Sequence, residues 1–114
     1  MKKFMALYMA PASVIAEMMK MTPDQGKAEM DAWVAWDGKH KAAIVDLGAP
    51  LGRTKRVSSS GVSDAHNEVT GYSIVEAESP EAAAKIFADH PHLKMKGTYI
   101  DVLDLVDINA MMAA

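Results

Sequence analysis

The stretch from Gly71 to Leu93, GYSIVEAESPEAAAKIFADHPHL, constrains the fold more than any other part of the chain. Its β-branched and aromatic beginning predicts a half-buried strand, which we extend over 68–78. Ser79-Pro80-Glu81 then predicts the start of a helix. Serine accepts an otherwise unpaired N–H, proline has none to lose, and glutamate suits the first turn. We expect this helix to end at Pro91, because proline disrupts a helix interior.

Two further strands, near the two ends of the chain, carry apolar side chains on both of their faces. Phe4–Met9 has aromatic and aliphatic side chains at every position, and Thr98–Ile108 has apolar residues on both alternating faces. A strand with one face in water alternates between apolar and polar residues instead. We therefore expect both faces of these two strands to be covered.

A long helix is predicted to begin after Thr22, because Thr22-Pro23-Asp24-Gln25 has the residues of a capping box. We expect it to run from about Pro23 to Leu47, with Gly48 as its C-terminal stop. Trp36 is placed on the flank of the apolar stripe of this helix. The stripe itself consists of Met30, Trp33, Val34, Ile44 and Leu47.

The remaining segments complete a recognisable order of elements. Pro11–Met21 is predicted to be a short helix, Leu51–Ser58 a second strand, and 58–67 a long, exposed hairpin connection in which His66 is solvated. The order strand, helix, strand, strand, helix, strand is the ferredoxin-like βαββαβ plan, an α+β fold with a four-stranded antiparallel sheet. Its helices cover one sheet face. The simplest cover for the other face is a second copy, which predicts a homodimer with its sheets packed face to face.

Composition limits the classes of function. The 114 residues are expected to form a single domain, and a net charge of −3 provides no basic surface for nucleic acid or an anionic membrane. The absence of cysteine excludes disulfides, thiolate catalysis and cysteine-based metal sites. The apolar run after Met1 is too short for a signal peptide, and we expect a soluble cytoplasmic protein with no membrane partner.

The predicted long helix carries the first candidate acid–base group. Asp37 falls within the apolar stripe, and both His40 and Lys41 are close enough along a helix to reach it. One interpretation is a structural ion pair between Asp37 and Lys41. The other is a catalytic pair in a cleft, in which the Asp37 carboxylate orients the His40 imidazole as a general base.

The second cluster is Asp89-His90-Pro91-His92. His90 is interpreted either as a cap at a helix end or as a second proton donor or anion contact, and His92 is expected to be exposed. In the hypothesis of a small-molecule enzyme, Tyr72, Trp36 and His92 bind the substrate. The spacing of the histidines matches no metal-binding motif, so neither a metal nor another cofactor is expected.

The order and spacing of several segments resemble the YCII-related proteins, and particularly their DGPF-domain branch. The segments are KKFMALYM, WVAW, LGAPLG and GYSIVEAESPEAAAKIFADHP, which together cover nearly the whole chain. This resemblance implies a dimeric α+β barrel. Better-studied YCII-like members use a His–Asp pair whose aspartate precedes a proline, whereas here His90 precedes Pro91 and Asp89 lies one position earlier.

Two functions from different classes follow. The first is a dimeric protein that binds or transforms a small organic molecule by lyase-like or isomerase-like acid–base chemistry, in a cleft between helices and sheet. The second is a non-enzymatic, dimeric accessory or regulatory module. A pocket around His40 and Tyr72 would favour the first, and solid packing there would favour the second.

Overall fold

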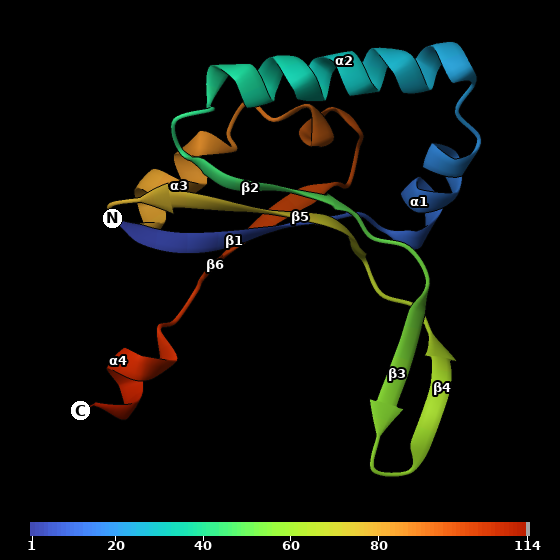
Figure 1. The fold of residues 1–114 in the computed structure, drawn as a ribbon. Helices are drawn as coiled ribbons and strands as arrows, with labels where there is room; N and C mark the ends of the chain where they lie inside the picture. Colours follow the sequence, from blue (N-terminus) through green and yellow to red (C-terminus); the bar gives the residue numbers. More distant parts are fainter. Residues whose placement is uncertain (114) are drawn as a thin grey trace.

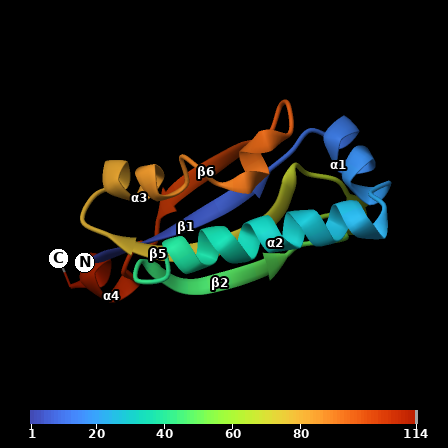
Figure 2. The same ribbon diagram turned by 90° about the horizontal axis from the view of Figure 1, so that it is seen from above.

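The computed structural model describes residues 1–113, in which helices lie over one face of an antiparallel sheet (Figures 1 and 2). The elements along the chain are β1 (Lys2–Met9), α1 (Ala12–Met19), α2 (Pro23–Lys39), β2 (Ile44–Pro50), β3 (Thr54–Ser58), β4 (Gly61–Ala65), β5 (Val69–Ala77), α3 (Pro80–Ile86), the 3₁₀ helix η1 (Pro91–Lys94), β6 (Tyr99–Asp104) and α4 (Ile108–Met112). None of the helices in this described part is both long and apolar enough to cross a lipid bilayer.

The main sheet has four strands in the order β2-β5-β1-β6, and every neighbouring pair is antiparallel. The central strand β1 pairs with β5 on one side and with β6 on the other. Strands β3 and β4 form a separate two-stranded hairpin. The predicted α+β class and four-stranded antiparallel sheet are therefore confirmed.

The strand and the capped helix of the 71–93 stretch are confirmed, but the helix ends earlier than predicted. The Ser79 side chain accepts a hydrogen bond from Ala82 N–H at 3.1 Å, and Pro80 is the first helical residue. Helix α3 ends at Ile86 rather than at Pro91, because the next N–H groups bond only three residues back, as in Phe87 N–H to Ala84 O at 3.1 Å. Pro91 instead begins η1.

Helix α2 begins as predicted and ends eight residues before the predicted end. The capping box at Thr22 and Gln25 is present, with both reciprocal hydrogen bonds. The helix ends at Lys39, and Ile44 belongs to β2, where it pairs with Val75. The β-branched residues at 44 and 45 suit a pleated strand better than a helix, so Ile44 and Leu47 matched the helical spacing by coincidence.

This error also misplaced the buried face of α2. Met30 and Val34, predicted to face the interior, are 66% and 63% exposed. Trp36, predicted to lie on the flank, is the buried residue of the helix, and Trp33 packs partly buried beside it. Residues three apart share a helix face, so these two indoles lie on the side of α2 that faces the sheet.

The strand predicted at 51–58 is only partly correct. Residues 51–53 are not in a strand, Thr54–Ser58 form β3, and part of the predicted connection, Gly61–Ala65, forms β4. His66 is exposed in the segment that follows, as predicted. The last strand is also shorter than predicted and ends at Asp104, and Ile108–Met112 form α4. Ala114, at the end of the predicted Met-rich tail, lies outside the described residues.

The core lies between the sheet and the helices. Alternate side chains of β1 and β5 point into it, including Phe4, Tyr8 and Val75, each no more than 1% exposed. They pack against Trp36 from α2 and against Ala83 and Phe87 from α3 and its end. This face of the sheet is closed by aromatic side chains.

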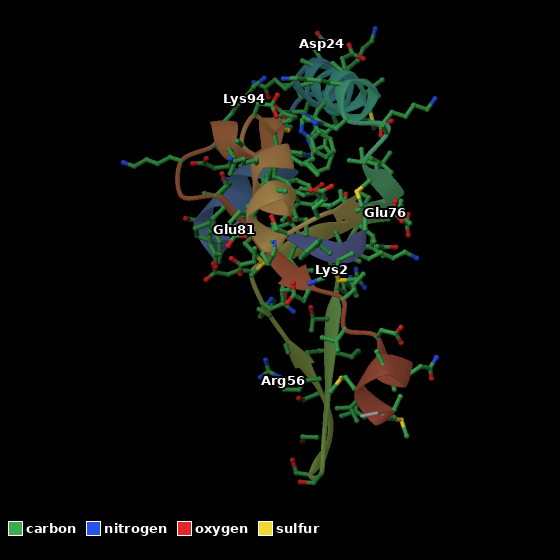
Figure 3. All side chains as sticks on the ribbon, turned by 90° about the vertical axis from the view of Figure 1, so that its left-hand side faces the viewer. Lys2, Asp24, Arg56, Glu76, Glu81 and Lys94 are labelled. Carbon is green, nitrogen blue, oxygen red and sulfur yellow. The ribbon has the colours of Figure 1, made fainter. Side chains whose placement is uncertain are left out.

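The opposite sheet face carries a cluster of apolar side chains, with Asp101 beside Leu7, and no helix within residues 1–113 is packed on it. Leu7 lies opposite Tyr72, while Met5 lies opposite Ile74 on one side and Leu103 on the other. These residues alternate with the buried ones along their strands, so they share the other face. We call this surface the open face. The hairpin β3–β4 and the helix α4 both extend from this side of the sheet (Figures 1 and 3).

Strand β2 approaches β5 very closely at Gly48. Gly48 has φ of +81°, and a Cβ at this position would lie 1.7 Å from the backbone oxygen of Tyr72. The pairing of β2 with β5 is irregular on both sides of Asp46, as in a β-bulge. Next to Gly48, the Ser73 hydroxyl donates a hydrogen bond to the backbone oxygen of Leu47 at 2.6 Å.

Candidate functional site

A histidine–aspartate pair lies where the end of α2 meets the turn after α3. His40 is the C-terminal cap of α2, and its Nε2 lies 3.2 Å from Oδ1 of Asp89. The ammonium group of Lys39 bonds the other carboxylate oxygen, Oδ2. The His40 side chain is 19% exposed and that of Asp89 is 43% exposed, so the pair is accessible from solvent.

The charges around Asp89 determine which nitrogen of His40 carries the proton. The hydrogen bond from Lys39, assisted by the one from His40, lowers the pKa of Asp89 to about 2. Asp89 is therefore a carboxylate at neutral pH and can only accept a hydrogen bond, so Nε2 of His40 donates. In neutral His40 the lone pair then lies on Nδ1, to which no group among residues 1–113 is hydrogen-bonded.

Asp37 does not orient His40. The Asp37 side chain is half-buried, and within residues 1–113 it bonds neither His40 nor Lys41. His40 lies just past the last helical residue, with φ of −110° and ψ of 15°, and its ring packs against Trp36 at 5.1 Å. The helical spacing that would join Asp37 to His40 or Lys41 is therefore lost. Asp89, which is 49 residues from His40 in sequence, takes the place beside His40 that was predicted for Asp37.

Trp36 lies on the buried side of the His40–Asp89 pair. Its indole N–H donates to the backbone oxygen of Ile86 at 3.3 Å, and its ring stacks with Phe87 at a centroid distance of 5.3 Å. The indole therefore ties α2 to the end of α3. It therefore holds in place the end of α2, which carries His40, and the turn after α3, which carries Asp89.

His90 points away from its neighbour Asp89, into the core, where it is 2% exposed. Its ring packs against the rings of Trp33, Trp36 and Tyr8 at centroid distances of 4.3, 4.4 and 4.7 Å. Its Nδ1 accepts a hydrogen bond from His92 N–H at 2.9 Å, so His90 caps the start of η1 and not the end of α3.

The protonation of His90 follows from this burial. Burial, reinforced by the neighbouring His92, lowers the pKa of His90 to about 3. Because Nδ1 is an acceptor, the neutral ring carries its proton on Nε2. This Nε2 is buried and has no hydrogen-bond partner in the described chain. As positioned, His90 does not reach solvent.

His92 is buried, and the prediction that it is exposed was wrong. It is 5% exposed, and its Nε2 donates to the backbone oxygen of Met9 at 2.8 Å. The cause is η1, which begins at Pro91 and turns the chain back toward the end of β1. His92 thus packs at the end of the sheet where β1 ends.

Tyr72 lies on the open face, so the structure does not bring it to His40. A different tyrosine, Tyr8, occupies the core side of the sheet. Its hydroxyl donates to Ser73 Oγ at 2.7 Å, and Ser73 in turn donates to Leu47 O. Burial raises the pKa of Tyr8 to about 12, although the bond to Ser73 opposes this shift. Successive side chains of a strand point to opposite faces. Tyr8 and Phe4 are four positions apart, and this even spacing is the sequence signal that places them on the same face.

Two surface grooves of the described chain lie away from His40 and His90, which line neither of them. The larger, of about 720 Å³, is lined by Met1, Lys2, Lys3 and residues Asp104 to Asp107. The smaller, of about 390 Å³, is lined by Glu17, Met21, Gln25, Ala28, Glu29 and Met95. Among residues 1–113, no group of three or more acidic or histidine side chains is placed to hold a metal ion.

The arrangement therefore provides a solvent-accessible pair, His40 and Asp89, above an aromatic core that contains His90 and His92. No protein-family model matches this sequence, and comparison with curated proteins finds no similar one.

Proposed function

We propose that this protein is a small homodimer that transforms a small organic molecule by acid–base chemistry, with His40 as the base and Asp89 as the group that positions it. The observation that carries this proposal is the 3.2 Å contact between His40 Nε2 and Asp89 Oδ1, with Lys39 on the second carboxylate oxygen. A carboxylate that fixes the tautomer of a partly exposed imidazole is a common arrangement for general-base catalysis.

The chemistry of the pair follows from its hydrogen bonds. The free lone pair on Nδ1 of His40 accepts a proton from an acidic C–H next to a carbonyl or carboxylate group. The imidazolium that forms is stabilised by the Asp89 carboxylate. The proton then returns to a different carbon of the substrate in an isomerisation, or it remains on His40 while a leaving group departs in an elimination.

The sheet order β2-β5-β1-β6 supports a ferredoxin-like βαββαβ plan, with the β3–β4 hairpin inserted between its second and third strands. We propose on this basis that the chain is a member of the YCII-related dimeric α+β barrels. Asp89 is not the residue directly before Pro91, but it is the residue that contacts His40. A cytoplasmic location belongs to the same proposal.

The open face supports the proposed homodimer. Met5, Leu7, Tyr72, Ile74 and Leu103 form an apolar surface across three strands, which no helix of the described chain covers. A two-fold axis that places two such faces against each other would bury both of them in a single interface.

The dimer is tested by Ile74→Lys, which places a charge in the centre of the open face. We expect the wild-type chain to sediment as a dimer at micromolar concentration and this variant as a monomer. Val34→Lys is the matched control, because Val34 is exposed on α2, on the helix-covered side. A monomeric wild-type chain, or a dimeric Ile74→Lys variant, would contradict the proposed interface.

The catalytic proposal is tested with a panel of small carbonyl compounds and organic acids that carry an acidic C–H, with or without a β leaving group. For a compound that is turned over, we expect His40→Ala and Asp89→Asn to lower kcat by about 10²-fold or more. Asp37→Asn should leave turnover unchanged, because within residues 1–113 the Asp37 side chain bonds neither His40 nor Lys41. Full activity of His40→Ala would exclude the assignment of the base.

One observation favours a non-enzymatic accessory module instead. His40 does not line either of the two grooves described above, whereas the open face is an extended surface suited to a protein contact. A chain that binds none of the panel compounds, as followed by amide chemical shifts, would favour this second function.

A further inference from the structure

The β3–β4 hairpin is an extended arm with little of its own to stabilise it. Its five paired positions run from Thr54 opposite Ala65 to Ser58 opposite Gly61, and they pair with no other strand of the described chain. Val57 and Val62 lie directly opposite each other and are 77% and 69% exposed. An isolated two-stranded hairpin is only marginally stable in water, so an ordered arm of this kind needs a surface to pack against.

The direction of the arm indicates where this surface lies. Figures 1 and 3 show that the hairpin leaves the sheet on the side of the open face, the same side on which α4 lies. The hairpin emerges at the end of the sheet where Pro50 pairs with Gly71. The larger groove lies at the opposite end, where Phe4 pairs with Asp104. The arm and the groove of one chain are therefore too far apart to meet.

We propose that the hairpin of each copy seats in the groove of a second copy, the groove being lined by Met1, Lys2, Lys3 and residues Asp104 to Asp107. This inference rests on the homodimer proposed above. When two open faces pack together with their ends exchanged, each arm lies over the partner's groove. Both arms then make the same contact, as two-fold symmetry requires.

The charges of the two segments are complementary. Residues 53–65 carry three basic side chains, Arg53, Lys55 and Arg56, and one acid, Asp64, so the arm has a net charge of +2. Residues 104–107, the segment that lines the groove, carry two aspartates and no basic residue, a net charge of −2. Lys2 and Lys3 form the other wall of the groove, so the basic side of the arm must face the aspartate wall.

The apolar side chains are matched in the same way. Val57 and Val62 form one exposed apolar pair on the arm, and Leu105 and Val106 in the groove wall are 40% and 61% exposed. Contact between them would bury all four side chains, which favours association through the hydrophobic effect. A stabilised arm would in turn add contact area beyond that of the open face.

Single cysteines test this contact cleanly, because the natural sequence contains none. We would prepare Val62→Cys and Val106→Cys in differently tagged chains, refold them together and oxidise them. The expected product is a disulfide between the two different tags, at several times the yield obtained when Val34→Cys on α2 replaces Val106→Cys. A disulfide between two Val62→Cys chains as the main product would overturn the proposal. Equal yields with Val106→Cys and with Val34→Cys would overturn it too.

A second measurement separates the arm from the dimer itself. The double variant Val57→Asp, Val62→Asp should keep the circular dichroism of the wild type while its dimer dissociation constant rises about tenfold or more. An unchanged constant in a dimeric protein would overturn the arm and leave the open-face dimer intact. A monomeric wild-type chain would overturn both, and the turnover test on His40 would remain independent of either outcome.

Discussion

Asp89 and His90 are adjacent in the chain, yet their side chains belong to two very different environments. Asp89 lies at the surface, 43% exposed in its side chain, between Lys39 and His40. His90 lies 2% exposed among Tyr8, Trp33 and Trp36. The turn between α3 and η1 directs one side chain outward and the next one inward.

This contrast separates a histidine that can exchange protons from one that cannot. His40 has a carboxylate partner on Nε2, and its side chain reaches solvent. His90 and His92 use one nitrogen each to fix the backbone, and they pack as aromatic core residues. The residue type alone does not assign a histidine to catalysis. Access to water and hydrogen-bond partners are what distinguish His40 from the two buried histidines.

Acid should destabilise the protein through the buried histidine. The pKa of His90 is about 3 in the folded protein and about 6.5 when unfolded, so its contribution to stability is complete above pH 6.5 and is lost as pH falls from 6.5 toward 3. At about 1.4 kcal/mol per pKa unit, this loss amounts to about 2 kcal/mol between pH 6.5 and 5, and on the order of 4 kcal/mol by pH 3.

Urea unfolding at pH 7, 6 and 5 measures this effect before most carboxylates titrate. The variant His90→Phe should lose most of the pH slope in this range, whereas His66→Ala should keep it, because His66 is exposed. If His90→Phe retained the slope of the wild type, a different group would be responsible.

Truncation of His90 should cost about 3 kcal/mol of unfolding free energy at pH 7. The variant His90→Ala leaves a cavity between three aromatic rings and removes the acceptor for His92 N–H. Chemical denaturation provides the measurement, and His66→Ala should change stability by less than about 0.5 kcal/mol. Equal effects of the two variants would mean that the ring of His90 is not packed as described.

The hydrogen bonds of Tyr8 and Ser73 predict a smaller difference within the buried region. Ser73→Ala removes the acceptor for the Tyr8 hydroxyl and the donor to Leu47 O, which should cost about 2 kcal/mol. Tyr8→Phe leaves the bond from Ser73 to Leu47 intact and should cost about 1 kcal/mol. Thermal unfolding of both variants tests this order. A larger loss of stability in Tyr8→Phe than in Ser73→Ala would contradict it.

The smallest effect on stability is expected at the surface pair. Asp89→Asn should change the unfolding free energy by less than about 1 kcal/mol, because the carboxylate is largely solvated. It should nevertheless reduce the fraction of His40 that carries its proton on Nε2, as read from the nitrogen chemical shifts of the ring. Asp37→Asn should leave those shifts unchanged. A change in Asp37→Asn comparable to that in Asp89→Asn would return Asp37 to the role first predicted for it.

Local signals in the sequence predicted much of the fold. The apolar run of β1, the β-branched and aromatic residues of β5, the caps at Thr22 and Ser79, and the prolines that follow those caps are all local signals. The end of α2 was predicted incorrectly because Ile44 and Leu47 fit a helical spacing. The consecutive β-branched residues Ile44 and Val45 were the stronger signal.

The candidate site was only half predicted. His40 was identified from its proximity to a polar position in an apolar helix, but its partner Asp89 comes from a turn 49 residues later. Contacts between distant segments depend on how the helices pack, and no local pattern contains that information. The burial of His92 was missed for the same reason, since η1 brings it to the end of β1.

Gly48 restricts how this sequence can change during evolution. Its positive φ and the 1.7 Å approach that a Cβ would make to the Tyr72 backbone exclude every other amino acid without movement of β2. In a saturation library selected for folding, this position should retain glycine, while the exposed Gly38, with no atom within 4 Å of its virtual Cβ, should accept many residues. The same glycine then becomes a marker by which distant homologues of this chain can be aligned.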